Sequence, residues 1–378
     1  MKNRLPGLNG LRAIAASFVL FSHVYQIAGI EGDARAKAFY WHHNLLGGNM
    51  VNLFFVISGF IITHILFQEK NRTGTISLRH FYLKRILRIW PIYFGIILLV
   101  FLIGYFTNWY DGYSKLNLAG ALMLGFFVMN FQLFIPGTRI SVLPHYWSLS
   151  IEEQFYFLWP AFFKYLKGKR SLYFPIIVVL GVIAARGLVV VLYRFWPSQL
   201  LLDILETLSL SKFGSISLGV IAAGLLHYGH PLLRYIYKPG LQLVSWVVFL
   251  LTIVLDFKIP YIHYELTAVM FAVVVLNVTT NPSSLLKMEN RFLDSTGMIS
   301  YGLYMFHWPL IPLIILVVKQ TGCWTFMQQT YQIPMVLISF ALTWGVAWIS
   351  YRYFESYFLS LRPGHHQSGP QTEIKLPA

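Results

Sequence analysis

The sequence predicts an all-α polytopic membrane protein, from its composition and from the lengths of its apolar segments. Hydrophobic residues make up 57% of the 378 residues, charged residues only 11%, and the mean hydropathy is +0.60. A soluble domain could not cover that much apolar surface. Segments of bilayer-spanning length predict transmembrane helices. There are eleven apolar segments, near residues 8–28, 46–67, 86–106, 117–135, 145–163, 172–193, 212–227, 241–256, 262–279, 298–319 and 333–354.

The loops between these segments indicate the orientation, because basic residues in short loops mark the cytoplasmic side of a membrane protein. The chain holds 29 Lys and Arg against 14 Asp and Glu, a net charge of +15, and most of the basic residues lie in short loops. This distribution indicates contact with anionic membrane lipids rather than with nucleic acid. Both termini are therefore expected in the cytoplasm, together with the basic stretches 68–88, 164–170, 234–238, 287–291 and 351–362.

Eleven crossings cannot satisfy this orientation, so we expect about ten transmembrane helices plus one re-entrant or interfacial segment. Between the third segment and the basic stretch 164–170 there are two apolar segments, but only one net crossing fits. We expect 117–135 not to cross, because it holds Gly120 and Gly125 and runs into an IPGTR loop. The alternative, that 145–163 is the segment that does not cross, stays open.

The two ends of the chain and its single cysteine add three expectations. The first segment is not expected to be a cleaved signal, because Arg12 lies inside it. Residues 361–378 are polar and rich in Pro and Gly, which predicts a disordered cytoplasmic tail. Cys323 has no partner for an internal disulfide, and no Cys and His residues have metal-ligand spacing, so no metal site is expected.

The first segment carries an arginine and a histidine inside an apolar stretch. Such residues are costly within lipid and by default belong to a functional site that faces the protein interior. Arg12 and His23 are eleven residues apart, which corresponds to a rise of about 16 Å and nearly the same direction around a helix. Both side chains should therefore share one face. The alternative is an arginine that reaches back to the lipid phosphates and a histidine bonded to a neighbouring helix.

The second and third segments carry further polar and small residues. Asn52 lies at the outer end of the second segment and needs a hydrogen-bond partner within the protein, while Ser58 and Gly59 form a small pair that favours helix packing. Arg85 and Arg88 are three residues apart, on one helical face at the cytoplasmic surface. Anchoring by the positive-inside rule would explain them, but a matched pair of arginines also suits bidentate binding of phosphate.

The densest polar motif is LPHYWSLSIEEQFYFLWP, which places His145, Ser150, Glu152 and Glu153 at the outer end and in the body of one apolar segment. Glu153 is eleven residues from Lys164, about 16 Å into the membrane at helical rise. A carboxylate at that depth must be neutral or matched by a cation, so a His or Arg partner is expected. A structural ion pair is the alternative to a reactive site.

A further histidine, His307, lies in the motif ISYGLYMFHWPL, next to Pro309. A single buried histidine is usually a satisfied core residue. This one is expected at the same depth as Glu153 and somewhat below His23, which makes it a candidate for the same site.

In their order along the chain, these motifs resemble the bacterial membrane acyltransferase-3 family, from residue 5 to about 355. The resemblance implies a ten-helix enzyme of the bacterial inner (plasma) membrane, with residues 1–360 as its membrane acyltransferase domain. It implies transfer of an acyl group, usually acetyl, from cytoplasmic acyl-CoA to a hydroxyl of a cell-surface polysaccharide or lipid-linked glycan. The motifs are Arg12-x10-His23, FFVISGFIIT, Arg85-x2-Arg88, HYWSLSIEEQFYFLWP and ISYGLYMFHWPL.

This reaction needs a base for the acceptor hydroxyl and a grip on the phosphates of the donor. On the resemblance, His23 is expected to be the general base, with Glu153 or His307 as the residue that orients it. The expected acyl-CoA phosphate site consists of Arg12, Arg85 and Arg88. Residues expected to contact substrate or to support the site are His145, Asn52, Ser150 and Glu152.

Two features depart from the family pattern. Asn52 stands where the family often has an acidic residue, and the chain ends after its last apolar segment, without the extracytoplasmic hydrolase-like domain of some members. Transfer would then be completed within the membrane domain or by a separate extracytoplasmic transfer protein. Direct transfer and an acyl-enzyme intermediate both stay open. So do two other classes, a transporter of a lipid-linked sugar and a structural membrane protein that docks a partner.

Overall fold

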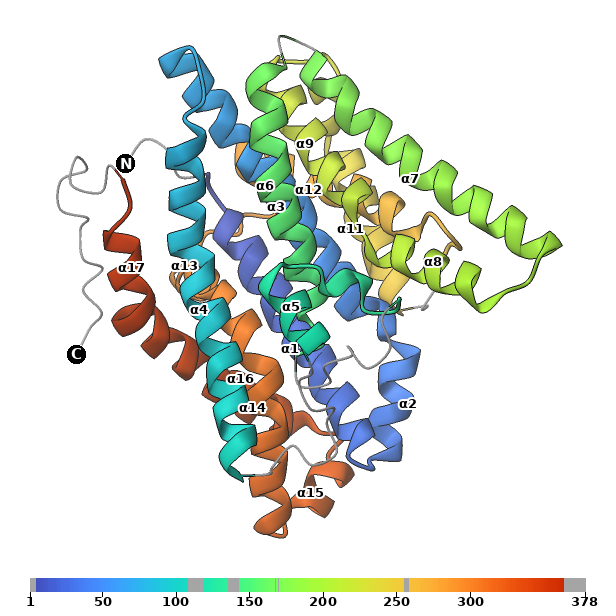
Figure 1. Ribbon diagram of the computed structural model, residues 1–378, viewed down its shortest axis with the longest axis vertical. Helices are drawn as coiled ribbons and strands as arrows, with labels where there is room; N and C mark the ends of the chain where they lie inside the picture. Colours follow the sequence, from blue (N-terminus) through green and yellow to red (C-terminus); the bar gives the residue numbers. More distant parts are fainter. Residues whose placement is uncertain are drawn as a thin grey trace.

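The computed structural model describes residues 5–107, 118–134, 143–166, 168, 170–254 and 258–363, and the regular structure in these ranges is helical (Figure 1). Eight stretches of helix within them are long and apolar enough to cross a membrane. They are α1 (Leu8–Ile30), α3 (Asn44–Thr73), α4 (Leu78–Thr107), α7 (Arg170–Phe195), the successive α8 (Gln199–Leu210) and α9 (Phe213–His227), α12 (His263–Thr280), α14 (Ser300–Gln320), and α16 (Ile333–Ile349) with its continuation. The chain is an all-α polytopic membrane protein, as the sequence predicts.

Two more helices lie where the sequence analysis expects spans. α6 (Tyr146–Tyr165) has 20 residues, which rise about 30 Å and so match the hydrocarbon thickness of a bilayer. α11 (Pro239–Val254) is apolar but shorter, with 16 residues. Together with the eight stretches above, these helices correspond to the ten segments expected to cross. The number of crossings and the side on which each terminus lies stay predictions.

The segment expected not to cross, 117–135, contains no long helix in its described part, residues 118–134. It forms α5 (Leu118–Gly125) and a 3₁₀ turn, η1 (Met129–Phe131). The eight residues of α5 rise only about 12 Å, less than half of a bilayer core.

Side chains of α6 bond the backbone of the turn that follows α5 and of the first residue of η1. The Met129 N–H donates to Ser150 Oγ at 3.2 Å, and Gln154 Nε2 donates to the Phe127 carbonyl at 2.8 Å. Irregular backbone at membrane depth needs such internal partners, because lipid supplies none. Ser150 therefore supports this turn.

α1 and α3 contact each other near the centre of the bundle (Figure 1). α2, α12, α13, α14 and α16 pack against α1, and α6, α9, α11 and α12 pack against α3. Two glycines allow α3 and α9 to approach closely. A Cβ at Gly59 would overlap the Ile216 carbonyl oxygen, and a Cβ at Gly219 would overlap the Val56 carbonyl oxygen. Gly59 therefore serves helix packing, as the sequence predicts.

Short helices and turns complete the described chain. They are α2 (Ala34–His42), α10 (Leu233–Ile236), α13 (Arg291–Met298), α15 (Trp324–Gln329), the π-helical turn η2 (Ser350–Glu355) and α17 (Ser356–Ser360). The Asp33 side chain caps α2 by accepting hydrogen bonds from the N–H groups of Arg35 and Ala36. η2 and α17 continue α16 and pack against α4.

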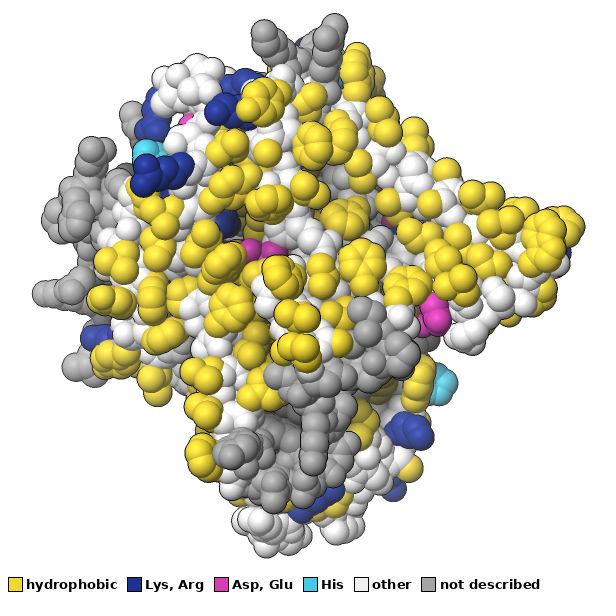
Figure 2. All heavy atoms as spheres, viewed as in Figure 1, with side chains coloured by type: hydrophobic (Ala, Val, Ile, Leu, Met, Phe, Trp, Pro, Cys, Tyr) yellow, Lys and Arg dark blue, Asp and Glu magenta, His cyan; other side chains and the backbone are white. Residues whose placement is uncertain are grey.

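The surface is predominantly hydrophobic. Figure 2 shows hydrophobic side chains across most of the described part of the visible face, with Lys and Arg grouped near its upper left and lower edges. On α7, Ile177 and Leu180 are 65% and 61% exposed. A surface of this kind suits lipid tails, which cover apolar side chains without the hydration cost that water imposes.

Candidate active site

Three pockets lie along the bundle. The basic pocket, of about 850 Å³, is lined by Ile65, Gln68, Glu69, Asn71, Arg72, His80, Phe81, Lys84, Arg85, Arg88 and Arg362. The central pocket, of about 170 Å³, is lined by Arg12, Val51, Phe54, Phe55, Ile57, Ser58, Ile61, Ile62, Ile65, Arg85, Arg88, Ile89, Ser148, Leu149, Glu152, Tyr156, Ser300, Tyr301 and Tyr304. The histidine pocket, of about 610 Å³, is lined by Ser22, His23, Gln26, Tyr40, Asn44, Gly47, Gly48, Val51, Gln132, Leu133, Pro144, His145, Trp147, Glu206, Leu210, Tyr264, Tyr304 and Trp308.

Neighbouring pockets share lining residues, so the three form a series. Ile65, Arg85 and Arg88 line both the basic and the central pocket. Val51 and Tyr304 line both the central and the histidine pocket. A long, narrow ligand could therefore extend from the arginines to His23.

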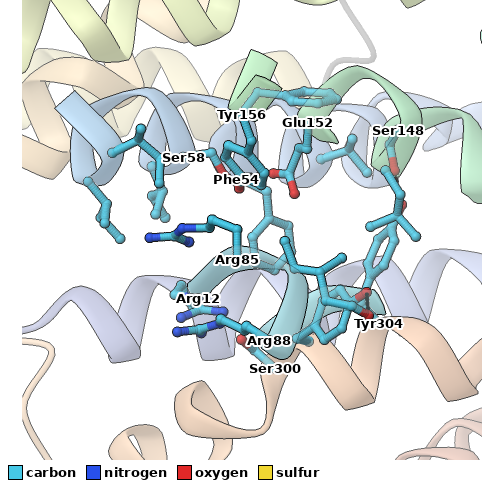
Figure 3. Close-up of a pocket in the computed structure, with 18 of the residues that line it drawn as sticks. Arg12, Phe54, Ser58, Arg85, Arg88, Ser148, Glu152, Tyr156, Ser300 and Tyr304 are labelled. Carbon is cyan, nitrogen blue, oxygen red and sulfur yellow. Dashed lines mark hydrogen bonds between the residues drawn. The ribbon is translucent and has the colours of Figure 1, made fainter. Parts of the chain in front are cut away.

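Three arginines surround one end of the central pocket. Arg12 comes from α1, and Arg85 and Arg88 come from α4; Figure 3 shows their guanidinium groups directed toward the same cavity. The Arg85 guanidinium lies over the rings of Phe81 and Tyr156, 5.6 and 5.4 Å from their centroids. In the described chain none of the three arginines forms an ion pair with a carboxylate. Their charges are available to an anionic ligand.

Glu152 faces the arginines from α6, across the central pocket (Figure 3). Its Oε1 accepts a hydrogen bond from Ser58 Oγ at 2.6 Å, and Ser58 in turn accepts one from the Tyr156 hydroxyl at 3.1 Å. The chain of bonds fixes the carboxylate in the wall of the pocket. Ser58 thus faces the site, while Gly59, about 100° further around α3, packs against α9.

Glu153 points away from the pockets. Its Oε2 accepts a hydrogen bond from Trp90 Nε1 at 3.1 Å, and it lines none of the three pockets. The reason is helical geometry, since consecutive residues project about 100° apart. Glu152 and Glu153 therefore cannot both face the site.

His23 on α1 contacts His307 on α14. His23 Nδ1 and His307 Nε2 are 2.8 Å apart, and the two rings are nearly parallel, at 9°. His307 Nδ1 lies 2.5 Å from the carbonyl oxygen of Tyr304, one helical turn earlier. Of the two residues expected to orient His23, the structure brings His307 into contact with it and not Glu153.

These contacts assign the tautomers of both histidines. The Tyr304 carbonyl can only accept, so His307 Nδ1 carries the hydrogen, and in the neutral ring its Nε2 is then an acceptor. His23 Nδ1 must then donate to His307 Nε2, which leaves the lone pair of His23 on Nε2. Because His23 lines the histidine pocket, Nε2 is the nitrogen available to a ligand there.

His145 extends the histidine cluster. It is 2% exposed, and its ring centroid lies 5.1 Å from that of His307. Its carbonyl accepts a hydrogen bond from Ser148 Oγ at 2.9 Å, so the Tyr304 hydroxyl, 2.7 Å from Ser148 Oγ, is left to donate to Ser148. The cluster thus ties the start of α6 to α14 between the central and histidine pockets.

Asn52 lies outside the pockets. Its Nδ2 donates to the Tyr264 carbonyl at 2.7 Å and to Thr267 Oγ1 at 2.9 Å. The partner that the sequence analysis requires is therefore on α12. Asn52 joins α3 to α12, while Tyr264 itself lines the histidine pocket.

Several pocket residues were not singled out by the sequence. Tyr304 precedes His307 by three residues, a spacing that places both on one helical face and would have indicated its role. Arg362 follows α17 in a basic stretch that the positive-inside rule already explains. Its place in the basic pocket depends on how the last helix packs, which no local pattern reports. Among the described residues, no group of three or more His, Cys, Asp or Glu is placed to hold a metal ion.

Fold and site together define an integral membrane protein with a series of pockets between its helices. The chain belongs to the acyltransferase-3 family, whose model, described as an acyltransferase domain, matches residues 5–352. This assignment favours an enzyme over the transporter and docking-protein alternatives.

Relatives with named activities match nearly the whole chain. Peptidoglycan O-acetyltransferase OatA of Listeria monocytogenes is 24% identical over 374 residues, 93% of this chain and 55% of that protein. O-acetyltransferase OatA of Staphylococcus aureus strain NCTC 8325 is 25% identical over 397 residues, 93% and 57% of the two chains. A putative O-acetyltransferase of Staphylococcus aureus strain COL is 26% identical over 391 residues, 94% and 57%. The chain thus spans little more than half the length of these relatives. No solved structure matches the chain.

Proposed function

We propose that this protein is a membrane O-acyltransferase that moves an acyl group, acetyl in the first instance, from acyl-CoA to a hydroxyl of a cell-envelope glycan. The observation that carries the proposal is the series of pockets, with three arginines at one end and His23 Nε2 at the other. The names of the relatives support acetyl as the group transferred and peptidoglycan as the acceptor.

The donor lies along the series with its phosphates between Arg85 and Arg88. Guanidinium groups bind phosphate bidentately, and these two arginines stand where the basic pocket meets the central pocket. The pantetheine arm, a thin extended chain, occupies the central pocket beside Phe54 and Leu149. Arg12 and His23 are separated by about 16 Å of helix, and the arm carries the thioester across this distance.

The acceptor occupies the histidine pocket, where Tyr40, Trp147, Tyr264 and Trp308 offer aromatic surfaces to a sugar ring. Its hydroxyl oxygen attacks the thioester carbonyl carbon while its proton passes to His23 Nε2. The new C–O bond forms, the C–S bond breaks, and the thiolate takes the proton from His23. His307 holds the tautomer in which Nε2 can accept that proton. An acyl-enzyme variant of this scheme would use the same base.

Orientation follows from the same arrangement. The basic pocket opens among the stretches assigned to the cytoplasm by their charge, where acyl-CoA is made, and the histidine pocket opens toward the opposite side. The proposal therefore places the enzyme in the bacterial inner (plasma) membrane. Residues 1–360 act as one domain, with the acyl group crossing inside it.

Transfer can be measured with the purified chain in lipid nanodiscs, radiolabelled acetyl-CoA and soluble peptidoglycan fragments. Label should appear on the glycan with release of an equal amount of free CoA. His23→Ala should lower the rate by about 10² to 10⁴, the usual worth of a general base. His42→Ala is the matched control, because His42 is exposed on α2 and lines none of the pockets. Full activity of His23→Ala, or transfer without acetyl-CoA consumption, would refute the proposal.

A further inference from the structure

Arg362 lines the basic pocket on a side that Arg85 and Arg88 do not occupy. It follows α17, whereas the other two arginines belong to α4, against which α17 packs. Its Nε and Nη2 atoms are buried and make no hydrogen bond in the described chain. Buried donors of a charged group are costly to leave without a partner. An acceptor from outside the chain would therefore complete this part of the pocket.

The basic pocket also carries more positive charge than its own side chains balance. Its lining holds one carboxylate, Glu69, against Arg72, Lys84, Arg85, Arg88 and Arg362. Burial first, and then the neighbouring charges of Arg88 and Arg85, lower the pKa of Arg362 to about 10. Arg362 therefore stays protonated at neutral pH. Such a pocket suits a ligand with several negative charges at separate points.

Glu355 contributes a carboxyl group near the basic pocket but does not line it. The carboxylate is 8% exposed, accepts a hydrogen bond from Ser350 Oγ at 3.4 Å, and interacts electrostatically with Arg88 and Arg362. It ends the π-helical turn η2, a widened turn of a kind often found at functional sites.

The order of the arginines along the pockets matches the order of phosphate groups in acyl-CoA. Arg85 and Arg88 line the junction with the central pocket, while Arg362 lines only the basic pocket. In acyl-CoA the diphosphate adjoins the pantetheine arm, and the 3′-phosphate lies beyond it on the ribose. We propose that Arg362 binds the 3′-phosphate and makes the enzyme selective for acyl-CoA over its 3′-dephospho form. This inference rests on the proposed function, in which acyl-CoA is the donor.

Binding of the two donors to the full-length protein in nanodiscs tests this assignment. Wild-type protein should bind acetyl-CoA about 10- to 100-fold more tightly than acetyl-3′-dephospho-CoA. This ratio corresponds to the free energy of a charge-assisted hydrogen bond. Arg362→Gln should remove this preference while its affinity for the dephospho donor stays unchanged. That unchanged affinity also reports that the variant is folded.

Arg352→Gln is the matched control, because Arg352 is exposed on the preceding turn η2, over the Trp348 ring, and lines none of the three pockets. It should keep the full preference. The assignment would be overturned if Arg362→Gln retained the preference for acetyl-CoA, or if it lowered the affinity for both donors equally. A wild-type protein that binds neither donor would instead refute the proposed function and this inference with it, a result distinct from the other two.

Discussion

At the scale of single residues, the contact between His23 and His307 decides what the site can do. His307 Nε2 accepts from His23 Nδ1 at 2.8 Å, and the Tyr304 carbonyl holds His307 in the required tautomer. Without an acceptor at His307, His23 could place its hydrogen on Nε2 and would no longer present a base to the histidine pocket. In the proposed mechanism His307 fixes the tautomer and orientation of His23, which is one of the tasks of the aspartate in a hydrolase triad.

His307→Leu should therefore lower kcat by about 10²- to 10⁴-fold. The KM for acetyl-CoA should change little, because the substitution removes the hydrogen-bond acceptor of His23 but no contact with acetyl-CoA. His307→Gln should be milder, since its side-chain oxygen can accept from His23. Steady-state kinetics with a saturating acceptor separates the two constants. Glu153→Gln keeps the bond from Trp90 and should leave kcat near the wild-type value. A loss in Glu153→Gln equal to that in His307→Leu would assign the orienting role to Glu153 instead.

Arg85 and Arg88 provide the second test at this scale. Replacing either with Lys keeps the charge, and hence the topology, but removes the bidentate geometry. Acetyl-CoA affinity should fall about 10- to 100-fold, with turnover at saturating donor much less affected. Arg79 is exposed and lines none of the three pockets, so Arg79→Lys should bind acetyl-CoA as the wild type does. Unchanged affinity in both Arg85→Lys and Arg88→Lys would remove the pair from the donor site.

The sequence predicts these residues more readily than their pairing. Depth along a helix follows from counting residues, so the sequence alone predicts the depths of Arg12, His23 and His307 in the membrane. Which faces of different helices meet depends on packing across the bundle, and counting does not report it. For that reason the sequence left Glu153 and His307 as equal candidates to orient His23.

At the scale of helices, close packing of α3 on α9 holds Ser58 and the other α3 side chains in the pocket walls. Gly59 and Gly219 each lie against a backbone carbonyl of the opposite helix. The sequence indicates this contact through Gly59, but Ser58, which was expected to pack with it, instead lines the central pocket and bonds Glu152. The sequence does not predict α8. Residues 199–210 are too few to span a membrane, and the Ser198 side chain that caps the start of the helix is a weak signal on its own.

Gly59→Ala should destabilise the protein by about 1 to 3 kcal/mol, the usual cost of forcing an extra methyl group into a packed contact. The thermal unfolding midpoint in detergent should fall accordingly, and activity should fall with it as the Ser58 to Glu152 bond is displaced. Gly181→Ala on α7 is the control, since nothing lies near the added Cβ. Equal midpoints for the two variants would show that the α3–α9 contact is not tight.

At the scale of the whole molecule, the series of pockets can serve the proposed transfer only if its two ends open on opposite sides of the membrane. The composition of the chain predicts a membrane protein, and the loop charges predict which side each end faces. Joining the pockets into one route required the packing of α1, α3, α4, α6 and α14 around the central pocket, which the sequence does not report. Orientation is therefore the property that links the sequence prediction to the proposed reaction.

The native cysteine gives a direct test of that orientation. Cys323 is exposed, between α14 and α15, and the predicted topology places it outside the cell membrane. A membrane-impermeant maleimide should label it in right-side-out membrane vesicles without prior permeabilisation. In a Cys323→Ser background, Glu289→Cys introduces an exposed thiol in a basic loop predicted to be cytoplasmic, and this thiol should react only after permeabilisation. Labelling of Glu289→Cys in sealed vesicles would place the basic loops, and with them the acyl-CoA end of the route, on the outer side, where acyl-CoA is absent.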